Sequence, residues 1–301
     1  MAVAIAQRPL APLTTWRVGG PALRYAEPAS VEDLLGHIDA AEHSGLPWFV
    51  MGRGSNLLVA DAGFAGLALR MCGSWHAVEV GGRGSDTPSF DGDYVLAQSG
   101  ASSSAVVSAA MAAGLGGIAF LSSIPGSVGG AVFMNAGAHG AQTSEVLLGA
   151  RILQKDGTIA WKTPAELGMR YRHCALQGGG GIVLEAAFRV RPQPAADIRQ
   201  EILELARWRR ERQPREPSAG SVFRNPPGDS AGRLIEAVGL KGVAIGGAQV
   251  SPIHANFIIN TGSATARDIL ALIHEVQDRV AATYQIELIP EVRGVGLVLA
   301  R

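Results

Sequence analysis

The sequence has few cysteines, no excess of charge of either sign and no long apolar run. Its two cysteines, Cys72 and Cys174, stand in no Cys-x-x-Cys or zinc-ligand spacing. We therefore expect neither a disulfide framework nor a metal site, and a reducing compartment. Lysine plus arginine and aspartate plus glutamate number 26 each. With a formal charge of zero, no overall field attracts nucleic acid or an anionic membrane.

Apolar segments are short throughout the chain. No window approaches the roughly 20 apolar residues that a transmembrane helix needs. The apolar run at residues 1–6 is too short for the core of a secretory signal and has no basic prelude. We therefore expect a cytoplasmic protein, a monomer, with no membrane or nucleic-acid partner. The densest basic cluster has mixed signs, which is typical of a solvated helix face; it comprises Arg207, Arg209, Arg210, Arg212 and Arg215 among Glu201, Glu204, Glu211 and Glu216.

The composition favours a folded protein of more than one domain. Apolar residues make up 47% of the 301 residues and charged residues 17%, which suffices for a large core. This length predicts two or three domains. The run Pro192-Gln193-Pro194 reads as a boundary.

Helix and strand signals alternate along the chain. Ser30 is a candidate N-cap for a helix through residue 41, and Asp156-Gly157 predicts a hairpin turn. Glycine, serine and aspartate at 81–92 predict an exposed connection. Further helices are expected at 102–113, 196–212, 231–238 and 265–283, and strands at 48–51, 57–59, 67–71, 94–97, 255–260 and 286–292.

Two glycine-rich loops predict a cradle for a pyrophosphate. Glycine lets backbone amides approach a ligand and adopt positive φ, so successive glycines build concave sites lined by N–H groups. Each loop alone reads as an ordinary tight turn, whereas the two together favour a dinucleotide. The expected cofactor contacts are Gly52, Arg53, Gly54, Ser55, Asn56 and Leu57 in the first loop, Pro125, Gly126, Ser127, Gly129, Gly130 and Ala131 in the second, and Asn135 and Gly137 beyond it.

A Rossmann fold is not the expected scaffold for that dinucleotide. The run 114–119 satisfies G-x-G-x-x-A, but it follows an alanine-rich helix instead of a strand. In the first loop, Leu57 occupies the place of the third small residue. A different fold must therefore hold the cofactor.

The segment 218–226, SAGSVFRNP, is too polar for a core strand. It sets Ser221 between a glycine and an arginine, in a turn closed by proline. We interpret it as a loop that presents side chains to a ligand.

Six motifs in a fixed order resemble one family. They are TTWRVGG at 14–20, GRGSNLLV at 52–59, IPGSVGGA at 124–131 with NAG at 135–137, YR at 171–172, GSVFRNP at 220–226 and PEV at 290–292. Together they resemble the UDP-N-acetylenolpyruvoylglucosamine reductases, flavoenzymes of bacterial peptidoglycan precursor synthesis. The chain is similar to the shorter form of that family, which lacks an inserted tyrosine loop.

The resemblance implies an α+β fold and two cofactors. Two subdomains of the vanillyl-alcohol oxidase type, expected at 1–75 and 76–195, would hold FAD without a covalent link. A smaller α+β domain at 196–301 would bind the nucleotide-sugar substrate, and NADPH would donate the hydride. The family's catalytic residues correspond to Arg172, Ser221 and Glu291, and its substrate contacts to Tyr171, Asn225, Arg212 and His254. For Arg212 and His254, a helix surface and a strand edge are the alternative interpretations.

The three catalytic residues suit the implied chemistry. Hydride addition to C3 of an enolpyruvyl ether moves negative charge onto C2 and the attached carboxylate. Arg172 offers a fork of donors to that carboxylate, and a serine hydroxyl held in contact can protonate a basic carbon. Ser221 fits this second task. Glu291 would polarise the serine, polarise a water or orient the intermediate, and the sequence does not choose among these roles.

Three positions differ from the family's usual pattern. Cys174 stands where the family has a serine after Tyr-Arg-x, His139 replaces a tyrosine, and Ala119 replaces an acidic residue. We interpret Cys174 as a structural residue.

Two rival functions are kept open. One is an FAD-dependent sugar or alcohol oxidase of the same superfamily, although the first glycine loop has no histidine for a covalent flavin link. The other is a catalytically inactive protein that binds a nucleotide sugar. The presence of Arg172, Ser221 and Glu291 together argues against this second rival.

Overall fold

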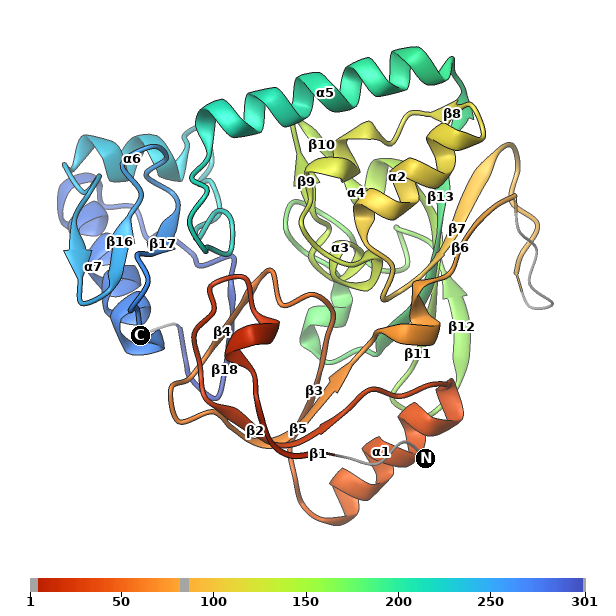
Figure 1. Ribbon diagram of the computed structural model, residues 1–301, viewed down its shortest axis with the longest axis horizontal. Helices are drawn as coiled ribbons and strands as arrows, with labels where there is room; N and C mark the ends of the chain where they lie inside the picture. Colours follow the sequence, from red (N-terminus) through yellow and green to blue (C-terminus); the bar gives the residue numbers. More distant parts are fainter. Residues whose placement is uncertain (1–4, 82–86, 300–301) are drawn as a thin grey trace.

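The computed structural model describes residues 5–81 and 87–299. The chain forms three units, each with its own sheet, and helix α5 (Ala195–Arg212) spans between the second and the third (Figure 1). The expected α+β class is confirmed. Within the described ranges no helix has the length and apolar character needed to cross a bilayer. The apolar run at 1–6 and the loop at 81–92 lie partly outside the described residues, at 1–4 and 82–86.

The first unit is a four-stranded sheet with one helix. Its strand order is β1-β2-β5-β3, in which β2, β5 and β3 run parallel and β1 is antiparallel. As predicted, Ser30 caps the helix, because its Oγ accepts a hydrogen bond from the Asp33 amide at 3.1 Å. The elements are β1 (Ile5–Pro9), η1 (Ala11–Leu13), β2 (Pro21–Ala26), α1 (Val31–His43), β3 (Trp48–Met51), β4 (Leu57–Val59), β5 (Phe64–Arg70) and η2 (Gly73–His76).

The second unit is a five-stranded antiparallel sheet covered by short helices. Its order is β12-β11-β13-β7-β6, and the predicted hairpin is confirmed, since Leu153 pairs with Ile159 across the Asp156-Gly157 turn. The elements are β6 (Val78–Val80), β7 (Tyr94–Gln98), α2 (Ser103–Ala112), β8 (Leu115–Gly116), η3 (Ala119–Ser123), α3 (Val128–Met134), β9 (Gly137–Ala138), β10 (Ala141–Gln142), α4 (Thr143–Val146), β11 (Leu147–Leu153), β12 (Ile159–Lys162), η4 (Ala175–Gly178), β13 (Ile182–Arg189) and β14 (Arg191–Pro192).

The third unit packs two helices on a small antiparallel sheet of order β15-β16-β17. The predicted helices are present, but the strand expected at 286–292 is wrong: only an isolated bridge, Phe223 with Pro290, forms there. The strand expected at 255–260 covers only its last three residues. The elements are α6 (Ala231–Ala237), β15 (Ala244–Ile245), β16 (Ala248–Val250), β17 (Ile258–Asn260), α7 (Ala266–Tyr284) and β18 (Arg293–Val295).

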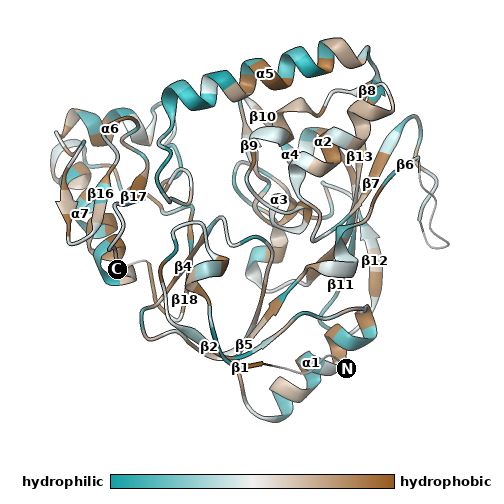
Figure 2. Ribbon diagram, in the orientation of Figure 1, coloured by the Kyte–Doolittle hydropathy of each residue, from teal (hydrophilic) through white to brown (hydrophobic). Residues whose placement is uncertain are grey.

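The basic cluster of α5 is a solvated face, as expected. Figure 2 shows mostly hydrophilic colouring along the half of α5 nearest the third unit. There Arg207 Nε pairs with Glu211 at 2.9 Å on the surface. Arg209 is the exception, because its Nη1 donates to the Ser123 carbonyl at 3.2 Å and ties α5 to the second unit.

Contacts between the first and third units bring the N-terminal and C-terminal parts of the chain together. Trp16 is fully buried in the core of the third unit, and its Nε1 donates to the Ile258 carbonyl at 2.7 Å. Asp61 accepts hydrogen bonds from the amides of Ala266 and Arg267 at the start of α7. Strand β18 pairs in parallel with β4, so the chain after the third unit returns to the first.

Candidate active site

The two predicted glycine loops face each other. A Cβ placed on Gly52 would overlap the Oγ of Ser127, and one on Gly126 would lie 3.3 Å from the Oγ of Ser55. Gly54 has a φ of +65°, and a Cβ there would overlap the Leu13 carbonyl. The loops therefore meet only because these positions carry no side chain.

The first loop offers free backbone donors. Within residues 5–81 and 87–299, no acceptor pairs with the backbone amides of residues 52–56. Such a run of unpaired amides fits an anionic group like a pyrophosphate. The Asn56 side chain is used differently, because its Nδ2 donates to the Glu291 carbonyl at 3.1 Å.

The second loop contributes shape more than donors. The amides of Val128 and Gly129 donate to the carbonyls of Ala101 and Ser99 at 2.9 and 2.8 Å. Ser127 is buried, and its Oγ accepts from the Gly130 amide as the N-cap of α3. The expectation that both loops present N–H groups therefore fits the first loop better than the second.

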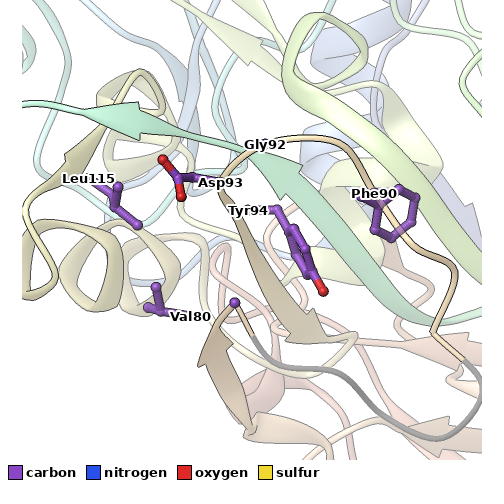
Figure 3. Close-up of a pocket in the computed structure, with 7 residues that line it drawn as sticks. Val80, Phe90, Gly92, Asp93, Tyr94 and Leu115 are labelled. Atoms are coloured by element: carbon purple, nitrogen blue, oxygen red, sulfur yellow. The ribbon is translucent and has the colours of Figure 1, made fainter.

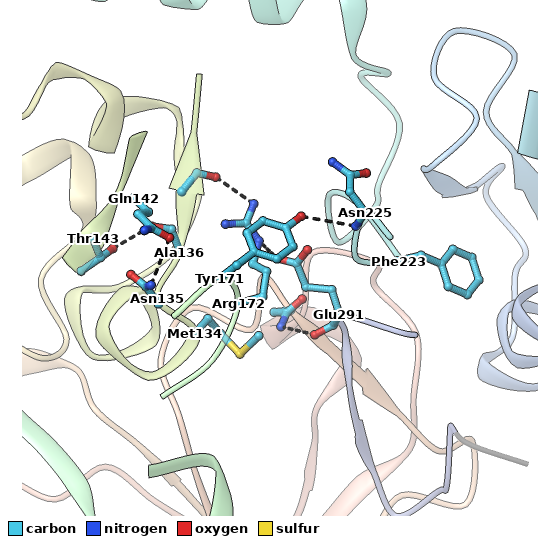
Figure 4. Close-up of polar contacts among 12 residues, drawn as sticks. Met134, Asn135, Ala136, Gln142, Thr143, Tyr171, Arg172, Phe223, Asn225 and Glu291 are labelled. Atoms are coloured by element: carbon cyan, nitrogen blue, oxygen red, sulfur yellow. Dashed lines mark hydrogen bonds and ion pairs between the residues drawn. The ribbon is translucent and has the colours of Figure 1, made fainter. Parts of the chain in front are cut away.

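Arg172 and Glu291 form an ion pair in the middle of the molecule. Arg172 Nε lies 2.7 Å from Glu291 Oε1, and each side chain is about one-sixth exposed, at 17% and 16%. Arg172 Nη2 also donates to the Gly137 carbonyl at 3.1 Å. Burial raises the pKa of Glu291, and this effect exceeds the lowering by Arg172 and Arg224. Figure 4 shows Tyr171, Arg172 and Glu291 converging on one region, with Phe223 pointing away from it.

Arg172 is held in a tight turn. Its φ of +52° lies in the left-handed region that a non-glycine residue rarely adopts. Asn135 supports this turn, since its Nδ2 donates to the Arg170 carbonyl at 2.9 Å and its Oδ1 accepts from the Ser144 amide. Asn135 is fully buried. Its side chain therefore forms hydrogen bonds inside the protein that hold the Arg172 turn.

The Ser221 segment is fixed against Glu291 through its backbone. The Glu291 amide donates to the Val222 carbonyl at 2.7 Å, one residue after Ser221. Asn256 clamps the next residue, because its Oδ1 accepts from the Phe223 amide at 2.9 Å and its Nδ2 donates to the Phe223 carbonyl at 2.8 Å. Ser221 itself is partly exposed. The fold thus brings the Ser221 segment, Arg172 and Glu291 together.

Tyr171 and Asn225 lie at the rim of this cluster. The Tyr171 side chain is 48% exposed, its ring centroid is 5.1 Å from the Arg172 guanidinium carbon, and its hydroxyl accepts from the Asn225 amide at 3.3 Å. Asn225 Oδ1 accepts from the Ala231 amide at the start of α6. Within residues 5–81 and 87–299, no acceptor pairs with the side-chain amide nitrogen of Asn225.

The two remaining expected substrate contacts lie in different places. Arg212 ends α5, pairs with Glu211 at 3.2 Å and lies over the Trp208 ring, without contact to the Arg172 cluster among the described residues. His254 is half-buried; its Nδ1 accepts from the Asn256 amide at 3.2 Å, and burial lowers its pKa. His254 therefore supports the Asn256 clamp.

Three residues near the Ser221 segment and Glu291 were not predicted from the sequence. Asn256 clamps the Ser221 segment, Arg224 acts on Glu291, and Arg293 lies with its guanidinium 5.5 Å from the Phe133 ring centroid. Arg224 and Arg293 stand inside or beside quoted motifs, so their charge was a signal. Asn256 has no local signal, because its partners are 33 residues away.

Two cavities lie outside the cluster. One of about 200 Å³ is lined by Val80, Phe90, Tyr94 and Leu115 at the outer sheet edge (Figure 3). Another, of about 430 Å³, lies between α5 and η3 and includes Ala119, His139 and Trp208. Neither contains a residue of the predicted catalytic set.

Among the described residues, none of the three positions that differ from the family pattern forms a hydrogen bond or ion pair with Arg172 or Glu291. His139 faces α5, with its Nε2 3.0 Å from the Ser123 Oγ and its ring 4.8 Å from that of Trp208. Cys174 is completely buried and free, and burial raises the pKa of its thiol. Ala119 is buried at the start of η3.

The fold and the paired glycine loops are those of a two-part flavin-binding scaffold followed by a third α+β unit. Residues 22–162 match the family described as FAD binding domain, and residues 213–295 match UDP-N-acetylenolpyruvoylglucosamine reductase, C-terminal domain. The chain belongs to the UDP-N-acetylenolpyruvoylglucosamine reductase family. The resemblance, and the fold class drawn from it, are confirmed.

Relatives of that name match over nearly the whole chain. The reductase of Rubrobacter xylanophilus is 43% identical over 96% of this chain and 94% of its own length. That of Heliobacterium modesticaldum is 44% identical over 96% and 90%. The crystal structure of the Thermus caldophilus reductase superposes with a TM-score of 0.79 at 34% identity, covering 98% of both chains.

Proposed function

We propose that this protein reduces the enolpyruvyl ether of UDP-N-acetylglucosamine enolpyruvate to UDP-N-acetylmuramate, in peptidoglycan precursor synthesis. The observation that carries this proposal is the Arg172–Glu291 pair, fixed beside the Ser221 segment and joined to the first glycine loop through Asn56. Family membership supports it over nearly the whole chain.

The first glycine loop would hold FAD. Its unpaired amides at residues 52–56 suit the pyrophosphate, and the close approach of Gly52 to Ser127 sets the width of the cradle. Bound FAD, once reduced by NADPH, supplies a hydride to the substrate. The first loop contains no histidine, so we propose a non-covalent cofactor.

Arg172 would bind the substrate carboxylate and stabilise the charge that develops there. Its guanidinium is planar and permanently charged, and its fork matches a carboxylate. The ion pair with Glu291 and the bond to Gly137 fix its direction before substrate arrives. Such preorganised charge lowers the barrier because no reorganisation is needed during the reaction.

Ser221 would give the proton to C2 of the substrate. A carbon that carries enolate-like charge is basic enough to accept a proton from a hydroxyl in contact with it. The Asn256 clamp and the Glu291–Val222 bond hold the Ser221 segment in place for this step. Tyr171 and the amide nitrogen of Asn225 would contact the nucleotide sugar.

We further propose that the protein is a cytoplasmic monomer with three domains at 1–75, 76–195 and 196–301. Consumption of NADPH, a cytoplasmic reductant, supports the location. Size-exclusion chromatography with light scattering measures the oligomeric state.

Turnover of the purified protein tests the function. We expect a yellow protein with non-covalent FAD that oxidises NADPH only when UDP-N-acetylglucosamine enolpyruvate is supplied. A colourless protein, or NADPH oxidation that is indifferent to this substrate, refutes the proposal. Oxygen-dependent oxidation of a sugar without NADPH would favour the oxidase, and binding of the substrate without turnover would favour the inactive protein.

A further inference from the structure

Arg224 has no role in the proposed chemistry, yet its side chain faces the ion pair. It stands three residues after Ser221, and its amide donates to the Ile289 carbonyl at 2.9 Å, which fixes its backbone. Its Nε is shielded from solvent and has no hydrogen-bond partner within residues 5–81 and 87–299. A buried donor without a partner is costly.

Backbone pairing places Arg224 on the same face as Glu291. Phe223 bridges Pro290 in antiparallel fashion, so Val222 lies opposite Glu291 and Arg224 opposite Ile289. Side chains alternate between the two faces of such a ribbon. Arg224 and Glu291 are diagonal neighbours across this bridge, within reach for long side chains, and the Arg224 charge acts on the Glu291 carboxylate.

The charges around Glu291 are unbalanced. Arg172, from the turn between β12 and η4, and Arg224, from the Ser221 segment, both lower the pKa of Glu291 against the effect of burial. Burial lowers the pKa of Arg293, and repulsion by the positive charge of Arg224 lowers it further. Two guanidinium groups thus act on one carboxylate, and among the described residues Arg172 alone forms an ion pair with it.

We propose that Arg224 is a positioning residue that takes over Glu291 when the carboxylate of the substrate binds Arg172. This inference rests on the proposed function. The incoming carboxylate competes with Glu291 for the same fork of donors. Glu291 is then left buried without its partner, unless a second cation receives it. The unpartnered Nε of Arg224 lies on the correct face to do so, and Glu291 stays ionised beside the Ser221 segment.

Removal of Arg224 couples substrate binding to protonation of Glu291. In Arg224→Gln, the displaced carboxylate takes up a proton, so the Kd for the nucleotide sugar rises with pH, approaching tenfold per pH unit. In the wild type and in Arg210→Gln, which changes an exposed arginine of α5, the Kd changes little between about pH 6 and 8. Flavin reduction by NADPH stays unchanged in Arg210→Gln.

The experiment titrates FAD-loaded protein with UDP-N-acetylglucosamine enolpyruvate at several pH values, without NADPH, and follows the flavin absorbance. Glu291→Gln removes the charge that must be relocated, so adding Arg224→Gln to it restores a pH-independent Kd. Arg224→Lys keeps a cation at this position, so we expect its Kd to depend on pH as little as that of the wild type. If Arg224→Gln does not bind FAD, Arg224→Lys still tests the inference.

Three outcomes overturn the inference. In the first, the Kd of Arg224→Gln for the nucleotide sugar is raised by the same factor at every pH. In the second, this Kd equals that of the wild type. In the third, the Kd of Arg224→Lys rises with pH as steeply as that of Arg224→Gln. Failure of the proposed function is recognised separately, because the wild-type protein itself would then neither bind this substrate nor oxidise NADPH in its presence.

Discussion

Ser221 is proposed to act in product formation and to have no part in the reduction of the flavin by NADPH. In Ser221→Ala, the flavin is still reduced by NADPH, because this half-reaction needs no proton from the loop. Product formation falls by a factor of about 10² to 10⁴, the usual contribution of a positioned proton donor. Stopped-flow absorbance of the flavin measures both half-reactions on one sample. Ser218→Ala, in the same loop, leaves both rates unchanged. If both half-reactions of Ser221→Ala slowed alike, Ser221 would be structural.

His254 makes the stability of the Ser221 clamp depend on pH. Burial lowers the pKa of His254 in the folded protein, so the unfolded chain binds a proton more readily near the usual value of about 6.5. Stability is therefore lost as the pH falls through that value. Protonation would also break the bond that Nδ1 accepts from Asn256.

The His254→Gln variant tests this dependence in urea unfolding at pH 5.5 to 7.5. We expect a shallower loss of unfolding free energy with falling pH, with a residual slope from His139, whose pKa is also lowered by burial and by Arg209. His43→Gln, on the exposed end of α1, keeps the wild-type slope. An unchanged slope in His254→Gln would contradict the assignment.

The sequence predicted that Arg172, Ser221 and Glu291 belong to one site, but it did not predict the hydrogen-bond partners of the surrounding residues. The ordered motifs brought out Arg172, Ser221 and Glu291, and the structure places Arg172 in contact with Glu291. Asn135 and Asn56 looked equally polar and available, yet both donate to backbone carbonyls. A local pattern shows that an amide is present, but only the tertiary structure shows which acceptor it reaches.

At the scale of elements, the first glycine loop is predicted to fail when Gly54 gains a side chain. Gly54 and Gly45 share a φ of +65°, so alanine at either position costs about 1 kcal/mol of backbone strain. At Gly54, a Cβ additionally overlaps the Leu13 carbonyl, whereas at Gly45 nothing lies within 4 Å. We therefore expect Gly54→Ala to lose FAD and Gly45→Ala to retain it.

Titration of the apoproteins with FAD, followed by quenching of flavin fluorescence, measures this difference. Because the two variants share the strain, any loss specific to Gly54→Ala reports the geometry of the loop. Equal affinity in both variants would remove the first loop from the proposed cofactor site.

Elements that depend on interactions between residues close in sequence were predicted. Elements that depend on pairing with distant segments were not. The Ser30 cap and the Asp156-Gly157 turn act over a few residues, and both are confirmed. The segment 286–292 has strand composition, but proline at 290 has no N–H to donate and only one bridge forms. Its continuation, β18, pairs with β4 more than 230 residues earlier, a contact without local signature.

At the scale of the whole molecule, the first and third units share one core. Trp16, Val18 and Leu58 pack among the buried side chains of the third unit, and Asn260 Nδ2 donates to the Trp16 carbonyl at 2.9 Å. Asp61 adds a cap to α7 from outside the unit. The predicted boundary at residue 75 therefore divides the sequence, but side chains of the first unit still pack in the core of the third. We expect the first and third units to unfold cooperatively.

Trp16→Phe tests this cooperativity in the full chain. Loss of the indole N–H leaves the Ile258 carbonyl buried without its partner, which costs about 1 to 3 kcal/mol of unfolding free energy. Trp208→Phe, at a site where the tryptophan is 40% exposed, costs less than about 0.5 kcal/mol. Hydrogen exchange followed by mass spectrometry should accelerate in β17 and β4 together in Trp16→Phe, because opening the shared core exposes both strands. Acceleration confined to β17 would mean that the two units open independently, in spite of the core that they share.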